Sequence, residues 1–308
     1  MIEISGFGKD YGEFTAVESL DLKIEAGEIF GFIGPNGAGK STTIRFLATL
    51  LRASRGSGSV NGFDVERNPM DVRRSVGYMP DMFGVYDGMR VWEFLDFFAV
   101  AYQIPRTQRQ RIIGEVLELV DLKHKRNDFV NGLSRGMKQR LCLAKTLVHD
   151  PPVLILDEPA SGLDPRARVL VKELLKELQR MGKTILISSH ILTELADFCS
   201  SIGIIERGKL LMNGPIDIIY RQIRSHRNLD IRVLRHVEVA EQIVSGYQGV
   251  RSVEVDGLSL LVEIDTDEAG LEAILRELVE ANLGLYCFAD LEPSLEDVFM
   301  SVTQGIVN

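Results

Sequence analysis

A glycine-rich segment near residue 35 has the residue types and the spacing that phosphate binding requires. Residues 34–41 read GPNGAGKS and match GxxxxGK[ST] between an apolar stretch and a helical one. The glycines let backbone N–H groups point at phosphate oxygens, and a helix N-terminus favours negative charge. Lys40 is expected to bridge the β- and γ-phosphates of a nucleotide, and Ser41 to ligate Mg²⁺. The predicted phosphate-binding residues are Gly34, Pro35, Asn36, Gly37, Ala38, Gly39, Lys40, Ser41 and Thr42.

Two adjacent acids end a second apolar run. Residues 153–159 read VLILDEP, so a short buried strand would bring Asp157 and Glu158 to its carboxyl end, beside the phosphate loop. Asp157 would hold Mg²⁺ through its water shell. Glu158 would be the base that orients and polarises the attacking water. Acids after a strand are often only helix caps, but a phosphate loop in the same chain favours a hydrolytic site.

A third segment separates this chain from the many other proteins that share a phosphate loop. Residues 133–140 read LSRGMKQR and open a predicted helix. They closely resemble the signature of ABC-type ATPases, usually written LSGGQ. In that family the signature docks on the γ-phosphate of the ATP held by the other subunit. The residues that would complete the site in trans are Ser134, Arg135, Gly136 and Met137. Taken alone, LSRG is equally compatible with a simple helix N-cap.

Three further positions match the same family. Asp164, in SGLD at 161–164, corresponds to the D-loop near the dimer seam. His190, at the end of ISSH, corresponds to the switch histidine that contacts the γ-phosphate. Tyr11 corresponds to the aromatic residue that stacks on adenine, although an isolated tyrosine usually only packs. The resemblance covers about residues 1–220.

The chain departs from the family pattern at two places. Asp81, in GYMPD, stands where the family usually has the Q-loop glutamine, and this shorter, charged side chain would reach Mg²⁺ only by a shift or through water. Arg135 and Met137 replace a glycine and a glutamine of the signature. Both departures, and the ending PSLEDVFMSVT, resemble the prokaryotic ABC-2-type exporters, so export is expected rather than import.

The resemblance implies ATP and Mg²⁺ as cofactors and two kinds of protein partner. One is a second ABC subunit, identical or different, because each ATP would be held between two subunits. The other is an integral-membrane permease, which is a separate chain. The protein would then act as an ATPase coupled to transport, cytoplasmic and peripheral on the inner face of the plasma membrane. The transported substrate would be selected by the permease.

The predicted elements fit an α/β fold. IEISGF and LDLKIE alternate as half-buried antiparallel strands do. IFGFI is apolar throughout, as a strand covered on both faces is, and VLIL and TILISS are predicted as the second and third apolar strands. Helical periodicity separates them. With the resemblance, the expected fold over residues 1–220 is an ABC-type P-loop NTPase domain, with a mixed core sheet, an antiparallel β subdomain and a helical subdomain.

A second domain is predicted over residues 229–308. Its pattern reads strand (Leu229–Arg235), helix, strand, strand, helix, strand, and Asp256-Gly257 is a hairpin signal between the middle strands. The order βαββαβ is that of a ferredoxin-like α+β unit. A final helix, SLEDVFMSVT, would follow. The domain offers no binding motif, so a dimer-stabilising or regulatory role is favoured over a ligand sensor.

The composition excludes several classes of protein. The 308 residues are 45% hydrophobic and 26% charged, with no apolar run long enough to span a membrane and no signal-peptide core. Three distant cysteines fit a reducing cytoplasm rather than a disulfide frame or zinc site. A net charge of -9 argues against nonspecific nucleic-acid binding. No nucleic-acid partner is therefore expected.

Aromatic residues follow the Q-loop, and in the family this neighbourhood receives a cytoplasmic helix of the permease. They are Phe83, Tyr86, Trp92 and Phe94. Most are expected to be core residues, with one or two exposed anchors. The alternative function is that of a soluble, non-transport ABC ATPase acting on ribosomes or DNA. Such proteins usually carry two ABC units or long coiled coils, and neither pattern occurs in this sequence.

Overall fold

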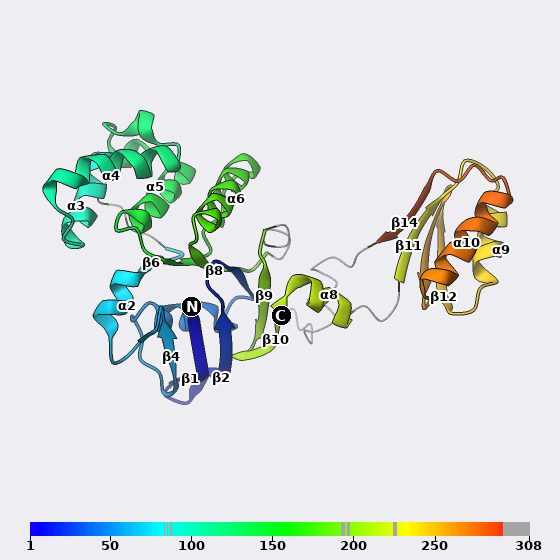
Figure 1. Ribbon diagram of the computed structural model, residues 1–308, viewed down its shortest axis with the longest axis horizontal. Coiled ribbons are helices and arrows are strands. Elements are labelled where there is room, and N and C mark those ends of the chain that lie inside the picture. The colour runs from blue at the N-terminus through cyan, green and yellow to red at the C-terminus, as the bar shows by residue number, and fades with distance from the viewer. Residues whose placement is uncertain are drawn as a thin grey trace. The chain divides into compact units, whose positions relative to one another are not determined.

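The chain forms two compact units, Met1–Ile216 and Asp217–Asn308. The computed structural model describes residues 1–82, 84, 86, 88–191, 195, 198–223 and 227–291. The first unit carries the phosphate loop, the two strand-end acids, the signature, the D-loop and the switch histidine, and Figure 1 shows it as sheets with a group of helices above them. The division falls four residues before the boundary at residue 220 that the sequence suggests.

A six-stranded sheet forms the centre of the first unit. Its order is β10-β9-β3-β8-β7-β6, and every neighbouring pair is parallel except β10 with β9. All residues of β3, β7 and β8 are buried, in keeping with the apolar runs IFGFI, VLIL and ILI that these strands contain. Because these strands are parallel, their carboxyl ends bring the following loops to one edge. The strands are β3 (Ile29–Ile33), β6 (Val76–Met79), β7 (Val153–Asp157), β8 (Thr184–Ser189), β9 (Ser201–Glu206) and β10 (Lys209–Pro215).

A second, antiparallel sheet has the order β2-β1-β4-β5. Its inward residues share one hydrophobic core with the first helix, where the rings of Phe7 and Phe46 stack with centroids 4.3 Å apart. The long β1–β2 hairpin ends at the register pair Tyr11 and Phe14. The strands are β1 (Ile2–Tyr11), β2 (Phe14–Ile24), β4 (Arg55–Val60) and β5 (Phe63–Asp64).

The helices of this unit begin where the sequence has capping or proline signals. Ser134 and Asp164 cap α5 and α6 with their side chains, and Pro69 and Pro165 occupy first-turn positions. In Figure 1, α3, α4 and α5 group together, away from β1, β2 and β4. The helices are α1 (Lys40–Leu47), α2 (Pro69–Ser75), α3 (Val91–Ala101), α4 (Arg106–Leu119), α5 (Arg135–Leu147) and α6 (Pro165–Arg180), with 3₁₀ turns η1 (Lys123–Lys125) and η2 (Val130–Gly132).

The second unit has the βαββαβ order and an antiparallel sheet ordered β12-β13-β11-β14. The first strand ends three residues earlier than the expected Arg235, because the backbone N–H groups of Leu234 and Arg235 donate instead to the carbonyl of Leu283. The expected final helix lies outside the described residues. The elements are α8 (Ile216–Ile223), β11 (Arg227–Arg232), α9 (Val237–Ser245), β12 (Val250–Asp256), β13 (Ser259–Ile264), α10 (Glu268–Glu280) and β14 (Cys287–Leu291).

Among the described residues, every helix is too short or too polar to cross a lipid bilayer.

Candidate nucleotide site

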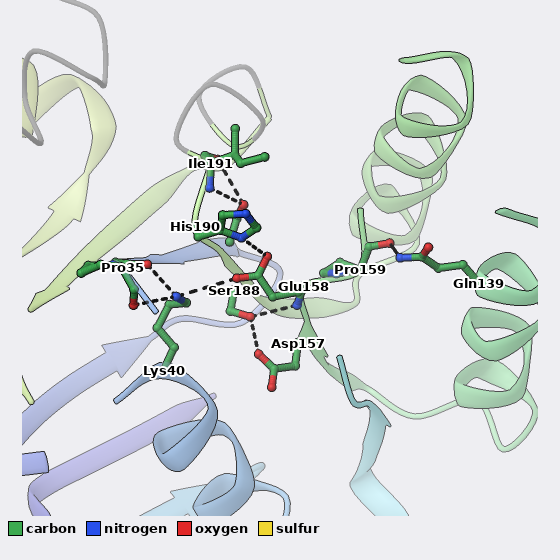
Figure 2. Close-up of polar contacts among 11 residues, drawn as sticks. Pro35, Lys40, Gln139, Asp157, Glu158, Pro159, Ser188, His190 and Ile191 are labelled. Atoms are coloured by element: carbon green, nitrogen blue, oxygen red, sulfur yellow. Dashed lines mark hydrogen bonds and ion pairs between the residues drawn. The ribbon is translucent and has the colours of Figure 1, made fainter. Parts of the chain in front are cut away.

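The phosphate loop connects β3 to α1. Gly39 precedes the helix with φ of 110°, a left-handed conformation that glycine adopts without steric cost. The Lys40 ammonium donates to the carbonyl oxygens of Gly34, at 2.6 Å, and Pro35, at 3.2 Å (Figure 2). The loop therefore curls around its own lysine, with the first turn of α1 directly behind it.

Lys40 is buried and faces the two acids at the end of β7. Its Nζ lies 3.8 Å from Oε1 of Glu158. Burial lowers the pKa of Lys40, while the negative charges of Glu158 and Asp157 act in the opposite direction. An ammonium group held in this position is available to bind a phosphate. Until a phosphate binds, the neighbouring carboxylates balance its positive charge.

Ser188 joins the two acids. Its hydroxyl, at the end of β8, donates to Oδ1 of Asp157 at 2.6 Å and accepts from the backbone N–H of Glu158 at 3.0 Å. The sequence offered only a weak signal for this role, because Ser188 is one of three hydroxyl residues in TILISS. The bond orients the buried Asp157 carboxylate, so one oxygen is fixed by protein.

His190 follows β8 and contacts the expected base. Its Nδ1 lies 2.8 Å from Oε2 of Glu158. Figure 2 shows the imidazole, the Glu158 carboxylate and Lys40 as one connected group, formed from residues distant in sequence. Glu158 itself has φ of 52°, a left-handed conformation that is strained for a residue with a side chain. Such strain at a reactive group is typical of functional sites.

These residues surround a cavity of about 380 Å³. The described residues that line it are Tyr11, Phe14, Ala16, Pro35, Asn36, Gly37, Ala38, Gly39, Lys40, Ser41, Thr42, Asp81, Glu158, Ser161 and His190. The structure thus brings most of the sequence-predicted site into one cavity. The sequence analysis missed Phe14, Ala16 and Ser161. The exposed ring of Phe14 was detectable only as an aromatic three residues after Tyr11.

The signature residues are not among those lining this cavity. Ser134 is exposed and caps α5, its hydroxyl accepting from the backbone N–H of Met137 at 3.3 Å. The N-cap interpretation is therefore realised, and the hydroxyl proton is still available to a phosphate. Asp164 likewise caps α6, accepting from Ala167 at 2.9 Å. Both the signature and the D-loop are surface features of this single chain.

The donor atoms near the phosphate loop fit Mg²⁺. Ser41 and Asp81 line the cavity, and the buried Asp157 directly precedes the lining residue Glu158, so the available ligands are oxygens, which this cation prefers. The described residues hold no cluster of three or more His, Cys, Asp or Glu side chains. A site with few protein oxygens suits an ion that keeps several waters and binds through substrate phosphates.

Comparison with known proteins decides the family. The family described as ABC transporter matches residues 17–161, and that described as ATP-binding protein DrrA1-3-like, C-terminal domain, matches residues 214–303. The daunorubicin/doxorubicin resistance ATP-binding protein DrrA of Streptomyces peucetius is 33% identical over 98% of this chain and 92% of its own length. The bacitracin transport ATP-binding protein BcrA of Bacillus licheniformis is 33% identical over 99% and 98%. This chain belongs to the ABC transporter family of ATP-binding proteins.

The fold of this ABC ATPase agrees with that assignment. A solved ATP-binding subunit of an ABC transporter has a TM-score of 0.66 and 32% identity, covering 72% of this chain and 92% of its own. The expected ABC-type P-loop fold is therefore confirmed, as is the expected activity. The chain is the ATP-binding and ATP-hydrolysing subunit of an ABC transporter. The roles of the individual side chains stay predictions, for which the cavity geometry supplies the physical argument.

Proposed function

We propose that two ABC subunits close on two ATP molecules and that this closure drives export through a separate membrane permease. One observation carries the proposal. A single cavity joins the phosphate loop, the aromatic Tyr11 and the Glu158–His190 pair, while the signature lies outside that cavity. The nucleotide-binding and catalytic residues are thus brought together within one chain, whereas the start of the signature helix is exposed to solvent.

The cavity supports specific roles for its side chains. Tyr11 would stack on adenine, and Lys40 with the loop N–H groups would bind the β- and γ-phosphates. Ser41 and Asp157 would hold Mg²⁺, with Asp81 as an additional ligand through water, and the ion would neutralise phosphate charge. Tyr11, Lys40, Ser41 and Asp81 line the cavity. Asp157 is buried, and its Oδ1 accepts from Ser188.

Glu158 would act as the base in this arrangement. Its carboxylate is positioned by the Nδ1 contact of His190, and its backbone by Ser188. A water between Glu158 and the γ-phosphate would lose its proton to the carboxylate as it attacks. His190 would contact the γ-phosphate through its other ring nitrogen. One imidazole would then hold both the base and the phosphate.

The second subunit would supply Ser134, Arg135, Gly136 and Met137 to this ATP, with Asp164 near the seam. Ser134 and Arg135 are exposed at the N-terminus of a thirteen-residue helix, where backbone N–H groups favour an anion. Moving an assembly from almost all open to almost all closed requires about 5.5 kcal/mol of differential binding. Two shared ATP molecules with several charge-assisted bonds each can provide this.

An aromatic surface formed by Tyr86, before α3, and Phe97, on α3, is the proposed permease contact. Tyr86 is 51% exposed and Phe97 45% exposed, with ring centroids 5.5 Å apart, whereas Phe94 is buried and Trp92 half-buried. Phe83 lies outside the described residues. A neighbouring cavity of about 400 Å³, lined by Leu50, Met70, Tyr102 and others, could accept a cytoplasmic helix of the permease. Docking there would hold the protein on the inner face of the membrane.

Export is proposed from two independent observations. The Asp81 and LSRGM departures resemble those of exporters, and one similar protein is named for resistance to daunorubicin and doxorubicin. A protein that confers resistance is expected to remove its compound from the cell. Residues 229–308 are proposed as an accessory domain that stabilises the dimer or regulates it.

The test is affinity purification of the tagged chain from detergent-solubilised native membranes, with mass spectrometry of the copurifying proteins. A polytopic membrane protein in near-equal amount is expected. Alanine at Tyr86 and Phe97 should weaken its recovery, whereas alanine at the exposed Val279 of α10 should not. Recovery of ribosomal or DNA-associated proteins alone would favour the soluble ABC ATPase instead.

A further inference from the structure

A buried glutamine links the signature helix to the catalytic segment. Gln139 lies on the second turn of α5 and is only 4% exposed. Its side-chain Nε2 donates to the carbonyl oxygen of Pro159, the residue after Glu158. Figure 2 shows the side chain reaching from α5 to that carbonyl. A buried donor and a buried acceptor satisfy each other here, so removing one partner leaves the other unpaired.

This hydrogen bond lies next to a residue whose backbone conformation is strained. Glu158 has a left-handed φ of 52°, which persists only where neighbouring groups determine it. The N–H of Glu158 donates to Ser188, and its carbonyl accepts from the N–H of Ser161 at 3.1 Å. The Pro159 carbonyl is the next acceptor along the chain, and Gln139 is its donor. Gln139 is therefore one of the groups that fix the direction of the Glu158 side chain.

A second contact joins the same two segments one turn earlier. A side chain at Gly162 would collide with the guanidinium of Arg135, so the arginine lies against the D-loop backbone. A Cβ at Gly136 would come within 3.4 Å of Leu163, which places the helix start in van der Waals contact with that loop. The start of α5 and residues 158–163 therefore pack as one body and are expected to move together.

We propose that Gln139 is a positioning residue for Glu158, which makes the alignment of the base depend on the placement of the signature helix. A nucleotide in the second subunit would engage the start of α5 and, through Gln139 and Pro159, align Glu158 in this subunit. The inference rests on the proposed function, namely that Glu158 is the base and that the signature acts in trans.

The test uses Gln139→Met in the full-length chain purified with its membrane partner. Methionine conserves length and shape but leaves the Pro159 carbonyl unpaired. We expect kcat to fall about 10- to 100-fold, as for small misplacements of a catalytic group, with the Kd for ATP within about twofold. Gln139→Leu, which also lacks a donor and buries no charge, should behave alike if the first variant does not fold.

The matched control is Ser75→Ala on α2. Ser75 is also buried, but its hydroxyl donates to the carbonyl of Asp71 within that helix, at 2.9 Å. The control should lose stability with kcat within about twofold of the original. Equal kcat losses in both variants, or parallel losses of ATP affinity and kcat in Gln139→Met, would show a merely structural glutamine and overturn the proposal.

A double-mutant cycle separates this inference from the proposed function. If Gln139 acts through Glu158, Gln139→Met should not lower the residual single-turnover rate of Glu158→Gln further. Additive losses would overturn the positioning role while leaving Glu158 as the base. Normal hydrolysis by Glu158→Gln alone would instead overturn the proposed function.

Discussion

The polar groups at the ends of β7 and β8 are buried, whereas those at the start of α5 are exposed to solvent. Asp157, Ser188 and Lys40 are buried and bonded to partners within the chain. Ser134 and Arg135 are exposed, although the signature that contains them is as specific a sequence motif as the phosphate loop. The buried groups position the chemistry before nucleotide arrives. The exposed groups have their full set of contacts only when a second subunit presents its ATP.

The largest effect should come from the buried half. Glu158→Gln is expected to lower kcat about 10²- to 10⁴-fold, because the amide cannot accept the proton of the attacking water. The phosphate loop is untouched, so ATP should still bind and an ATP-bound dimer should accumulate, measurable by light scattering. Glu177→Gln on α6, an exposed residue paired with Arg180, is the matched control and should leave kcat unchanged. Hydrolysis at the original rate would remove Glu158 from the catalytic role.

The buried histidine His149 tests the contrast between buried and exposed polar groups through the pH dependence of stability. Burial lowers the pKa of His149 from 6.5 to about 4, and its ring stacks on Tyr102 with centroids 3.6 Å apart. The folded chain keeps this imidazole neutral, while the unfolded chain protonates it below about pH 6.5. Stability from this group is therefore present above pH 6.5 and lost as pH falls towards 4, by on the order of 3 kcal/mol.

Urea unfolding at pH 7 and pH 5 measures this loss. The free energy of unfolding should decrease at the lower pH, and His149→Gln should show a smaller decrease because it has no imidazole to protonate. His124→Gln, at a turn with an exposed histidine, is the control and should retain the full pH dependence. The same slope in His149→Gln as in the original protein would contradict the assignment.

The exposed half should respond more modestly. Ser134→Ala is expected to cost about 1 kcal/mol of stability as a lost N-cap. It should also lower kcat about tenfold as a lost bond to phosphate. Asp267→Ala removes a similar cap from α10, accepting from Gly270 at 2.9 Å, in the unit without signature or phosphate loop. The control should lose stability alone. Equal activity in both variants would reduce Ser134 to a cap.

The smallest effect is expected at the base-binding edge. Phe14→Ala should raise the KM for ATP about three- to tenfold with kcat nearly constant, because an exposed ring beside Tyr11 contributes contact area to the adenine. Phe63→Ala, another exposed aromatic on β5 away from the cavity, should leave KM unchanged. Steady-state ATPase rates at varied ATP concentration decide between them. An unaltered KM in Phe14→Ala would assign base contact to Tyr11 alone.

Much of the site could be anticipated because its chemistry lies in contiguous motifs. Lys40 and Glu158 belong to short segments whose spacing already implies a strand, a turn and a helix. Ser188, Gln139 and His149 could not be anticipated in the same way. Each acts through a partner at least twenty residues away, Asp157, Pro159 and Val76 respectively, and such pairings depend on how strands and helices pack. The same reason explains the early end of β11, where a distant carbonyl competes for the backbone N–H groups.

The sequence by itself determined the family, the nucleotide chemistry and the alternation of apolar strands with helices, because these follow from local residue types and their spacing. Only the tertiary structure decided which polar side chains are buried and hydrogen-bonded within the chain and which are exposed at the surface. The parallel order of β3, β8 and β7 brings Lys40, Glu158 and His190 to one edge of the sheet, and no local pattern specifies that order. Hydrogen bonds with Ser188 and Ser161 then hold the left-handed Glu158, and the bond from Gln139 to Pro159 joins this segment to the helix that begins at the signature.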